Sequence, residues 1–189
     1  MNPFFLRLFR PSVASLLLSV CALGLAQPGG HGHPHGHKHG AHVHGQAAID
    51  LLLDGQGFEA ELTIPLEVLV GFERAPRTPD EQAQLDRALA IVADPARMLR
   101  PSTAAGCSAR PATVKAPDWT AAVAGADAHH DLVVRYRFEC KERERLAGIE
   151  ILAFEGFSRL RAVELRSVDE RGARAQRLGR SARIAKLSR

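Results

Sequence analysis

Two runs of alternating apolar and polar residues constrain what this 189-residue chain can fold into. Residues 46–54 (QAAIDLLLD) and 58–64 (FEAELTI) each place an apolar side chain at every second position. Successive side chains of a strand point to opposite faces, so each run predicts a strand with one buried face. Gly55-Gln56-Gly57 joins them into an antiparallel hairpin, and Pro65 ends the second strand because proline has no N–H to donate.

Residues 78–94 predict the main helix. Thr78 is a suitable N-cap, Pro79 fits the first helical position, and Glu81 completes a capping box. Asp94-Pro95 ends the helix. The apolar stripe of this helix consists of Leu85, Ala88, Leu89 and Val92.

The remaining pattern is mostly that of strands. Residues 66–76 read as a loop or a short helical turn, and KERERLAG at 141–148 reads as a short helical connection. Further strands are predicted at 107–114, 132–140, 148–154 and 159–168, with a last pair through Leu178 and Ile184. Many strands with one long helix predict a single α+β domain over residues 46–189, built on a mostly antiparallel sheet.

The first 26 residues have the pattern of a secretory signal peptide. Arg7 and Arg10 form a basic start, and residues 13–25 form an apolar stretch too short to span a bilayer. The small residues that follow predict cleavage near Ala26. Since no second long apolar stretch occurs, we expect an exported protein whose mature form does not span the membrane.

Export determines how the cysteines are interpreted. Cys21 leaves with the signal peptide, whereas Cys107 and Cys140 remain. Two cysteines in an exported domain most often form a disulfide, and two buried thiols are the alternative. Cys140 falls on the apolar face of its strand, where a bond to Cys107 would join two strands.

Residues 27–45 form a low-complexity segment that no packed core requires. Glycine, proline and lysine separate its histidines, so the segment has no apolar face to bury and we expect it to be flexible. Neutral imidazole is the commonest protein ligand for Zn²⁺, and it also suits Cu²⁺ and Ni²⁺. We predict a metal-binding tract, with an inert solubilising tract as the alternative. The seven ligands are His31, His33, His35, His37, His39, His42 and His44.

The folded domain offers further candidate ligands. His129, His130 and Asp131 lie just before the strand at 132–140, where they either join the tract in binding a metal ion or simply cap the strand. Glu73 is a weaker candidate, since such a residue more often pairs with an arginine such as Arg74. Because no hydrolase, P-loop or dinucleotide-binding motif occurs, we do not expect an enzyme.

Four short motifs occur in order along nearly all of the mature chain. They are HVHG at 42–45, LVGFERAP at 69–76, AAGC at 104–107 and YRFEC at 136–140. Together they resemble the ZrgA family of bacterial periplasmic zinc-associated proteins. The resemblance implies an exported, histidine-rich periplasmic protein that binds Zn²⁺ and assists zinc acquisition, alongside an ABC-type uptake system.

The resemblance also implies that the histidine segments, with His129 and Asp131, are the metal ligands. This chain departs from the family in two places. Arg74 stands where members often have histidine, and no long second histidine-rich insert precedes Asp131. The N-terminal tract must therefore supply most of the metal-binding capacity.

Two other functions stay open at the level of sequence. A Cu²⁺ or Ni²⁺ scavenger in metal detoxification would use the same imidazoles, and a non-catalytic, β-rich envelope interaction domain would make the tract secondary. Nucleic-acid binding is not expected. The formal net charge of +4 falls to +2 without Arg7 and Arg10, which is too small for a basic binding surface.

Overall fold

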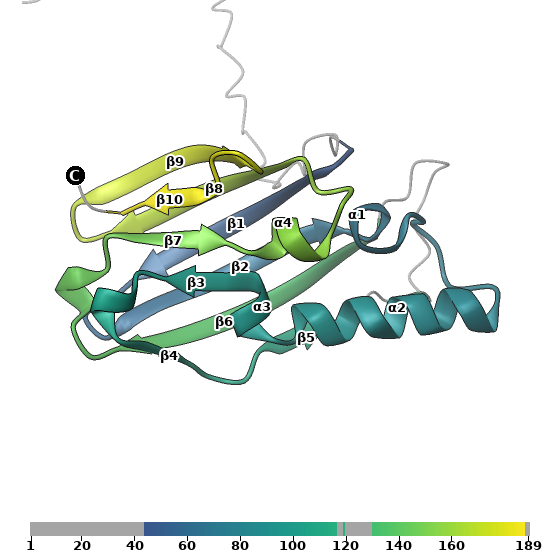
Figure 1. Ribbon diagram of the computed structural model, residues 1–189, viewed down its shortest axis with the longest axis horizontal. Coiled ribbons are helices and arrows are strands. Elements are labelled where there is room, and N and C mark those ends of the chain that lie inside the picture. Colours follow the sequence, from purple (N-terminus) through teal and green to yellow (C-terminus); the bar gives the residue numbers. More distant parts are fainter. Residues whose placement is uncertain (1–43, 117–118, 120–129, 188–189) are drawn as a thin grey trace, which may run out of the picture. The chain divides into compact units, whose positions relative to one another are not determined.

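A seven-stranded sheet is the larger of two sheets in the computed structural model, which describes residues 44–116, 119 and 130–187. The strand order is β4-β6-β2-β1-β8-β9, with β5 also paired to β6 (Figure 1). Every pairing is antiparallel except that of β1 with β8, so the predicted α+β class with a mostly antiparallel sheet is confirmed. The strands of this sheet are β1 (Gln46–Leu53), β2 (Gly57–Pro65), β4 (Cys107–Ala109), β5 (Thr113–Lys115), β6 (Asp131–Cys140), β8 (Ala162–Asp169) and β9 (Gly172–Gly179).

The predicted hairpin forms the centre of this sheet. β1 pairs with β2 in a register that places Leu51 opposite Ala60, and the apolar positions of both strands are buried. Phe58 of β2 stacks on Phe138 of β6, with ring centroids 4.7 Å apart. Only glycine fits at Gly57, because a β-carbon there would lie 2.0 Å from the Phe138 carbonyl oxygen. The alternation seen in the sequence therefore defines one continuous apolar face.

A second, three-stranded sheet covers that face (Figure 1). Its order is β10-β7-β3, and both of its pairings are antiparallel. The core lies between the two sheets, where Ile49, Tyr136 and Ile151 are each at most 2% exposed. The remaining elements are β3 (Leu99–Pro101), β7 (Gly148–Ile151), β10 (Ile184–Lys186), α1 (Leu66–Val70), α2 (Pro79–Val92), α3 (Pro95–Met98), α4 (Ala153–Gly156) and two 3₁₀ turns, η1 (Thr103–Ala105) and η2 (Arg143–Arg145).

The predicted helix is α2, and Thr78 and Pro79 begin it as expected. The predicted capping box is not closed, because Glu81 accepts hydrogen bonds from Arg74 and Arg77 instead of from the Thr78 N–H. The Thr78 side-chain oxygen accepts a hydrogen bond from the Glu81 N–H at 3.2 Å. The predicted apolar stripe faces the core, with Leu89 at its half-buried edge. At the other end of α2, the buried Tyr136 hydroxyl donates to the Val92 carbonyl at 2.8 Å, which ties the helix to β6. In the described part of the chain, no helix is long and apolar enough to cross a membrane.

Three strand predictions were wrong in detail. The strand expected at 107–114 is divided into β4 and β5, because Pro111 between them has no N–H for a continuous ladder. The strand expected at 148–154 stops at Ile151, and the continuous apolar run after it forms α4 instead. The two tail strands exist but belong to different sheets, since β9 pairs with β8 and β10 pairs with β7. Accordingly, Leu178 is buried whereas Ile184 is 58% exposed.

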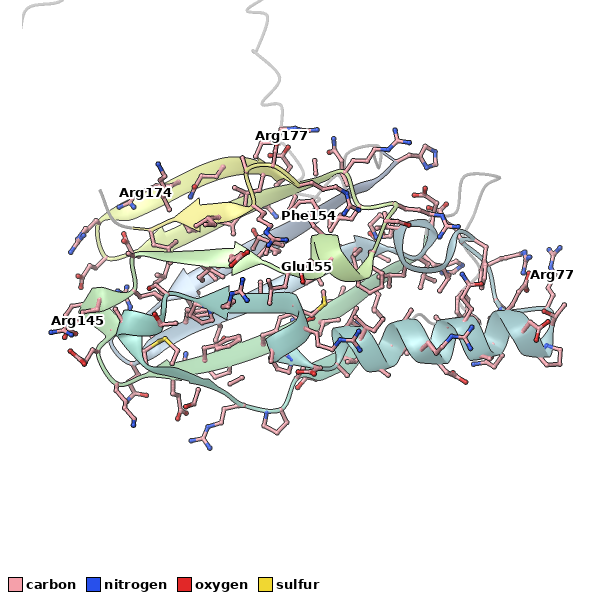
Figure 2. All side chains as sticks on the ribbon, viewed as in Figure 1. Arg77, Arg145, Phe154, Glu155, Arg174 and Arg177 are labelled. Carbon is pink, nitrogen blue, oxygen red and sulfur yellow. A yellow bond between two sulfur atoms is a disulfide. The ribbon has the colours of Figure 1, made fainter. Side chains whose placement is uncertain are left out.

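The predicted disulfide joins Cys107 of β4 to Cys140 of β6. The two residues are directly opposite each other in the antiparallel register. Figure 2 shows the bond at the end of the large sheet that lies away from α1 and α2. The bond holds the short strand β4 against the sheet and closes a loop with a sequence separation of 33.

Removing this disulfide should lower stability strongly. For C107A/C140A we expect the free energy of unfolding to fall by about 4 kcal/mol, the loop-closure entropy of a loop of this length. Urea unfolding followed by circular dichroism measures the change, and the wild type under reducing conditions should behave like the variant. A loss below about 1 kcal/mol, the size of an ordinary point substitution, would contradict this account.

Candidate metal centre

His44, the last histidine of the N-terminal tract, is placed by a turn just before β1. Gly45 has a φ of 78°, and its carbonyl accepts hydrogen bonds from the N–H groups of Arg161 and Ala162 at 2.8 and 3.2 Å. A β-carbon on Gly45 would lie 3.0 Å from the Arg159 carbonyl oxygen. The turn therefore ties His44 to the segment before β8, at one end of the large sheet.

Glu67 reaches the same end of the sheet because α1 follows directly after β2. The Leu66 N–H donates to the His130 carbonyl at 3.0 Å, which ties the start of α1 to the start of β6. Glu67 is the one residue of α1 that is not fully buried, and its side chain is 27% exposed. Its Oε2 atom is nevertheless inaccessible to solvent and has no hydrogen-bond partner within the described ranges.

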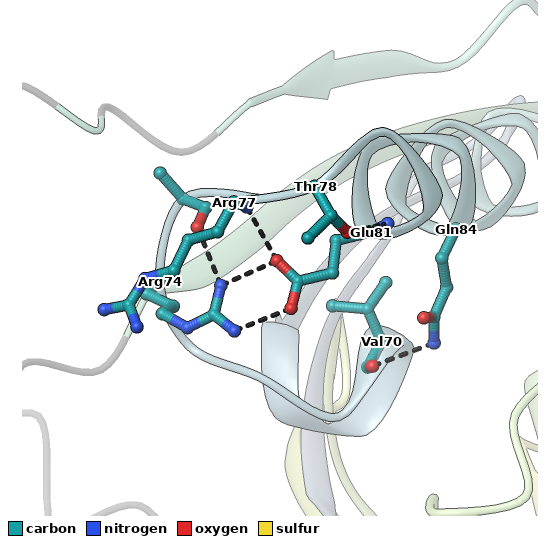
Figure 3. Close-up of polar contacts among 7 residues, drawn as sticks. Val70, Arg74, Arg77, Thr78, Glu81 and Gln84 are labelled. Carbon is teal, nitrogen blue, oxygen red and sulfur yellow. Dashed lines mark hydrogen bonds and ion pairs between the residues drawn. The ribbon is translucent and has the colours of Figure 1, made fainter.

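Glu73 returns towards Glu67 through a tight reversal after α1. Gly71, with a φ of 84°, closes the helix by donating its N–H to the Glu67 carbonyl at 2.8 Å. The loop that follows is held by α2, because the Arg74 guanidinium donates to both carboxylate oxygens of Glu81 at 2.7 and 2.8 Å (Figure 3). Glu73, next to Arg74 in the chain, is thereby held half-buried close to Glu67.

His44, Glu67 and Glu73 together form a metal-ligand group. One ligand atom of each lies within 4.8 Å of the others, and His44 Nδ1 is 3.5 Å from Glu67 Oε2. Imidazole nitrogen and carboxylate oxygen are both ligands of Zn²⁺, and three protein ligands leave a fourth position for water or another imidazole. A buried carboxylate oxygen without a hydrogen bond is costly, and a cation at this position would compensate it. The three residues therefore fit a divalent metal ion.

The other predicted ligands are only partly placed by the structure. His130 and Asp131 lead into and begin β6, and Asp131 lies opposite Pro65, the last residue of β2. They share the end of the sheet with the ligand group without belonging to it. The His130 ring instead meets the edge of the Trp119 ring, with centroids 5.0 Å apart. The predicted ligands outside the described residues are His31, His33, His35, His37, His39, His42 and His129.

Sequence reasoning did not single out Glu67, and it named Glu73 only as a weaker candidate. Glu67 is the single charged residue of LEVLV, a pattern typical of a short helix with one solvent-facing position. The hairpin register contained a usable signal. It pairs Ala48 with Thr63. The residue four positions before Ala48 is His44, and the residue four positions after Thr63 is Glu67. An acidic residue that lies opposite a histidine across the hairpin is the feature that would have identified Glu67.

Comparison with known families shows which family the chain belongs to. The family model for ZrgA family zinc uptake proteins matches residues 41–187, most of the chain and the whole ligand group. The chain belongs to the ZrgA family. The resemblance seen in the sequence motifs is thus confirmed, and a role in zinc acquisition follows at the level of the ZrgA family, whose activity is uptake. No curated protein sequence matches the chain significantly.

The pair of Arg74 with Glu81, which holds the loop that carries Glu73, should make the free energy of unfolding depend on pH in the acid range. Hydrogen bonds from Arg74, and then from the Arg77 N–H, lower the pKa of Glu81 from 4.5 to about 2. Because the pKa is lower in the folded state, this stabilisation is complete above about pH 4.5 and is lost as the pH falls towards 2.

We therefore expect the free energy of unfolding at about pH 6 to be higher for wild type than for E81Q. The two values should converge as the pH approaches 2. Chemical denaturation across this range measures the difference. D86N, which removes another exposed carboxylate of α2, is the control. A difference between wild type and E81Q that stays constant down to about pH 3 would exclude ionised Glu81 as its source.

Proposed function

We propose that this chain captures Zn²⁺ in the periplasm with its histidine tract and passes it, through His44, Glu67 and Glu73, to a zinc uptake system. The observation that carries the proposal is the position of His44. It is the last of the seven tract histidines, and its Nδ1 atom lies 3.5 Å from Glu67 Oε2. One residue therefore belongs both to the capturing tract and to the ligand group of the folded domain.

In this proposal the chain has three parts with separate tasks. Residues 1–26 are a signal peptide cleaved near Ala26, residues 27–45 capture the metal, and residues 46–189 form the α+β domain. The disulfide between Cys107 and Cys140 supports an oxidising compartment such as the periplasm. The partners are the Zn²⁺ ion and an ABC-type uptake system, and the chain has no catalytic role.

The transfer step follows from chain length and exposure. His42 is two residues from His44, so about 7 Å of extended chain separates their backbones. An ion held by the tract can exchange one imidazole at a time for Glu67 and Glu73 without losing all of its ligands at once. The His44 side chain is 74% exposed, which leaves the ion accessible to an acceptor. Accessible, exchanging ligands suit hand-off better than storage.

Further ligands come from the neighbouring strand end. We include His129, His130 and Asp131 in the proposed ligand set, since Asp131 begins β6 opposite the last residue of β2. All the proposed ligands are imidazoles and carboxylates, which also bind Ni²⁺ and bind Cu²⁺ more tightly than Zn²⁺. Selection of Zn²⁺ in the cell therefore depends on metal availability and on the acceptor.

Calorimetric titration of Zn²⁺ into chains that begin at Gln27 tests the proposal. In one variant, asparagine replaces the six tract histidines from His31 to His42 and His44 is kept. We expect this variant to retain one site of the wild-type chain. Adding E67Q should weaken that site at least about tenfold, the usual loss for a disturbed metal site. The matched control E170Q removes a carboxylate at the opposite end of the sheet and should have no effect.

The possible results separate the competing roles. If the variant with the six tract histidines replaced binds no Zn²⁺, the tract alone is the site and the folded domain serves to dock a partner. If E67Q leaves the affinity of this variant unchanged, the ligand group of the folded domain is refuted. Growth of a deletion strain under zinc chelation then tests the cellular role. Normal growth there, combined with sensitivity to excess copper or nickel, would favour detoxification.

A further inference from the structure

α2 holds residues 67–74, which include Glu67 and Glu73, at two points (Figure 3). The Gln84 side-chain amide donates to the Val70 carbonyl, the last residue of α1, at 2.9 Å. Glu81 holds the loop that follows, through its two hydrogen bonds from Arg74. Two of the three proposed metal ligands therefore belong to a segment whose geometry is set by a helix that supplies no ligand itself.

The Glu81 carboxylate accepts its hydrogen bonds from the loop that precedes α2, and not from the N-cap of its own helix. In a capping box, the glutamate at this position accepts the N–H of the N-cap residue, which here is Thr78. Glu81 Oε2 instead accepts the Arg77 N–H at 2.6 Å and one Arg74 N–H at 2.8 Å. The Thr78 side chain already caps α2. The carboxylate is thus directed backwards, into the loop that carries Glu73.

The same contact controls the charge next to Glu73. Arg74 is the adjacent residue, and a free guanidinium readily forms a bidentate pair with a carboxylate. Glu81 occupies this guanidinium with both of its oxygens, and the guanidinium carbon lies 5.1 Å from the centre of the Phe72 ring. Held from both sides, the Arg74 cation is kept in one place while Glu73 faces Glu67 and His44.

We propose that Glu81 is a positioning residue for the metal-ligand group. Its pairing with Arg74 fixes the loop that presents Glu73 and prevents the Arg74 cation from competing with the metal ion for that carboxylate. Glu81 itself does not contact the metal. This inference rests on the proposed function, because it requires Glu73 to be a ligand.

A double-mutant cycle tests the inference in the chain that begins at Gln27 and has asparagine in place of the six tract histidines. Zn²⁺ affinity is measured for E81Q, E73Q and E73Q/E81Q, with metal-free thermal unfolding as the check on folding. We expect E81Q to weaken binding about tenfold or more, the range found for residues that orient a ligand. In the E73Q background, E81Q should have no further effect. D86N, which removes a carboxylate of the same helix that accepts from Gln82, should bind within twofold of the parent.

R74K is the second variant, and it separates geometry from charge. Lysine keeps the positive charge but cannot form the two parallel hydrogen bonds to Glu81, so we expect weaker Zn²⁺ binding here too. The inference is overturned if E81Q and R74K both bind as tightly as the parent while E73Q binds weakly. It is also overturned if E81Q has its full effect in the E73Q background. If E73Q itself does not alter binding, the proposed ligand group fails and the inference fails with it.

Discussion

The pairing of β2 with β6 is the contact on which the rest of the structure depends. The two strands are hydrogen-bonded along the whole of β2, from Gly57 opposite Glu139 to Pro65 opposite Asp131. β1 lies on the other side of β2, also antiparallel. Because alternate strands run in opposite directions, the start of β1, the end of β2 and the start of β6 must lie at the same end of the sheet. The proposed metal-ligand group is assembled where these three strand ends meet.

Elements with a long, regular pattern could be predicted from the sequence. The hairpin, α2 and β6 each show several turns or pleats of their characteristic period, and the predicted export signal gave the expected pairing of the two cysteines a chemical reason. The second sheet could not be predicted, since β3 and β10 are three residues long and show no period. The parallel pairing of β1 with β8 was also inaccessible, because it joins Gln46 to Ala162 and depends on everything folded between them.

The candidate site was partly predictable for a different reason. His44 belongs to a conspicuous tract, so residue type alone pointed to it. Glu67 is an ordinary acidic residue in the sequence and Glu73 only a weaker candidate, and packing is what brings the two carboxylates together. The surrounding core buries one Glu67 oxygen, and the reversal at Gly71 brings Glu73 back towards it. The supporting contact between Arg74 and Glu81 likewise depends on where α2 lies relative to the loop.

The location of the disulfide has a consequence for the metal that the chain is proposed to carry. Asp131 and Cys140 are the first and last residues of β6, so about 30 Å of extended strand separates the proposed ligands from the sulfur atoms. Thiolates are strong ligands of zinc and would make a closed, slowly releasing site. Here both sulfurs are bonded to each other at the far end of the sheet. Even after reduction the thiolates would lie too far away to bind the ion. An ion bound at His44 would therefore be held by imidazole and carboxylate ligands alone, from which it can dissociate.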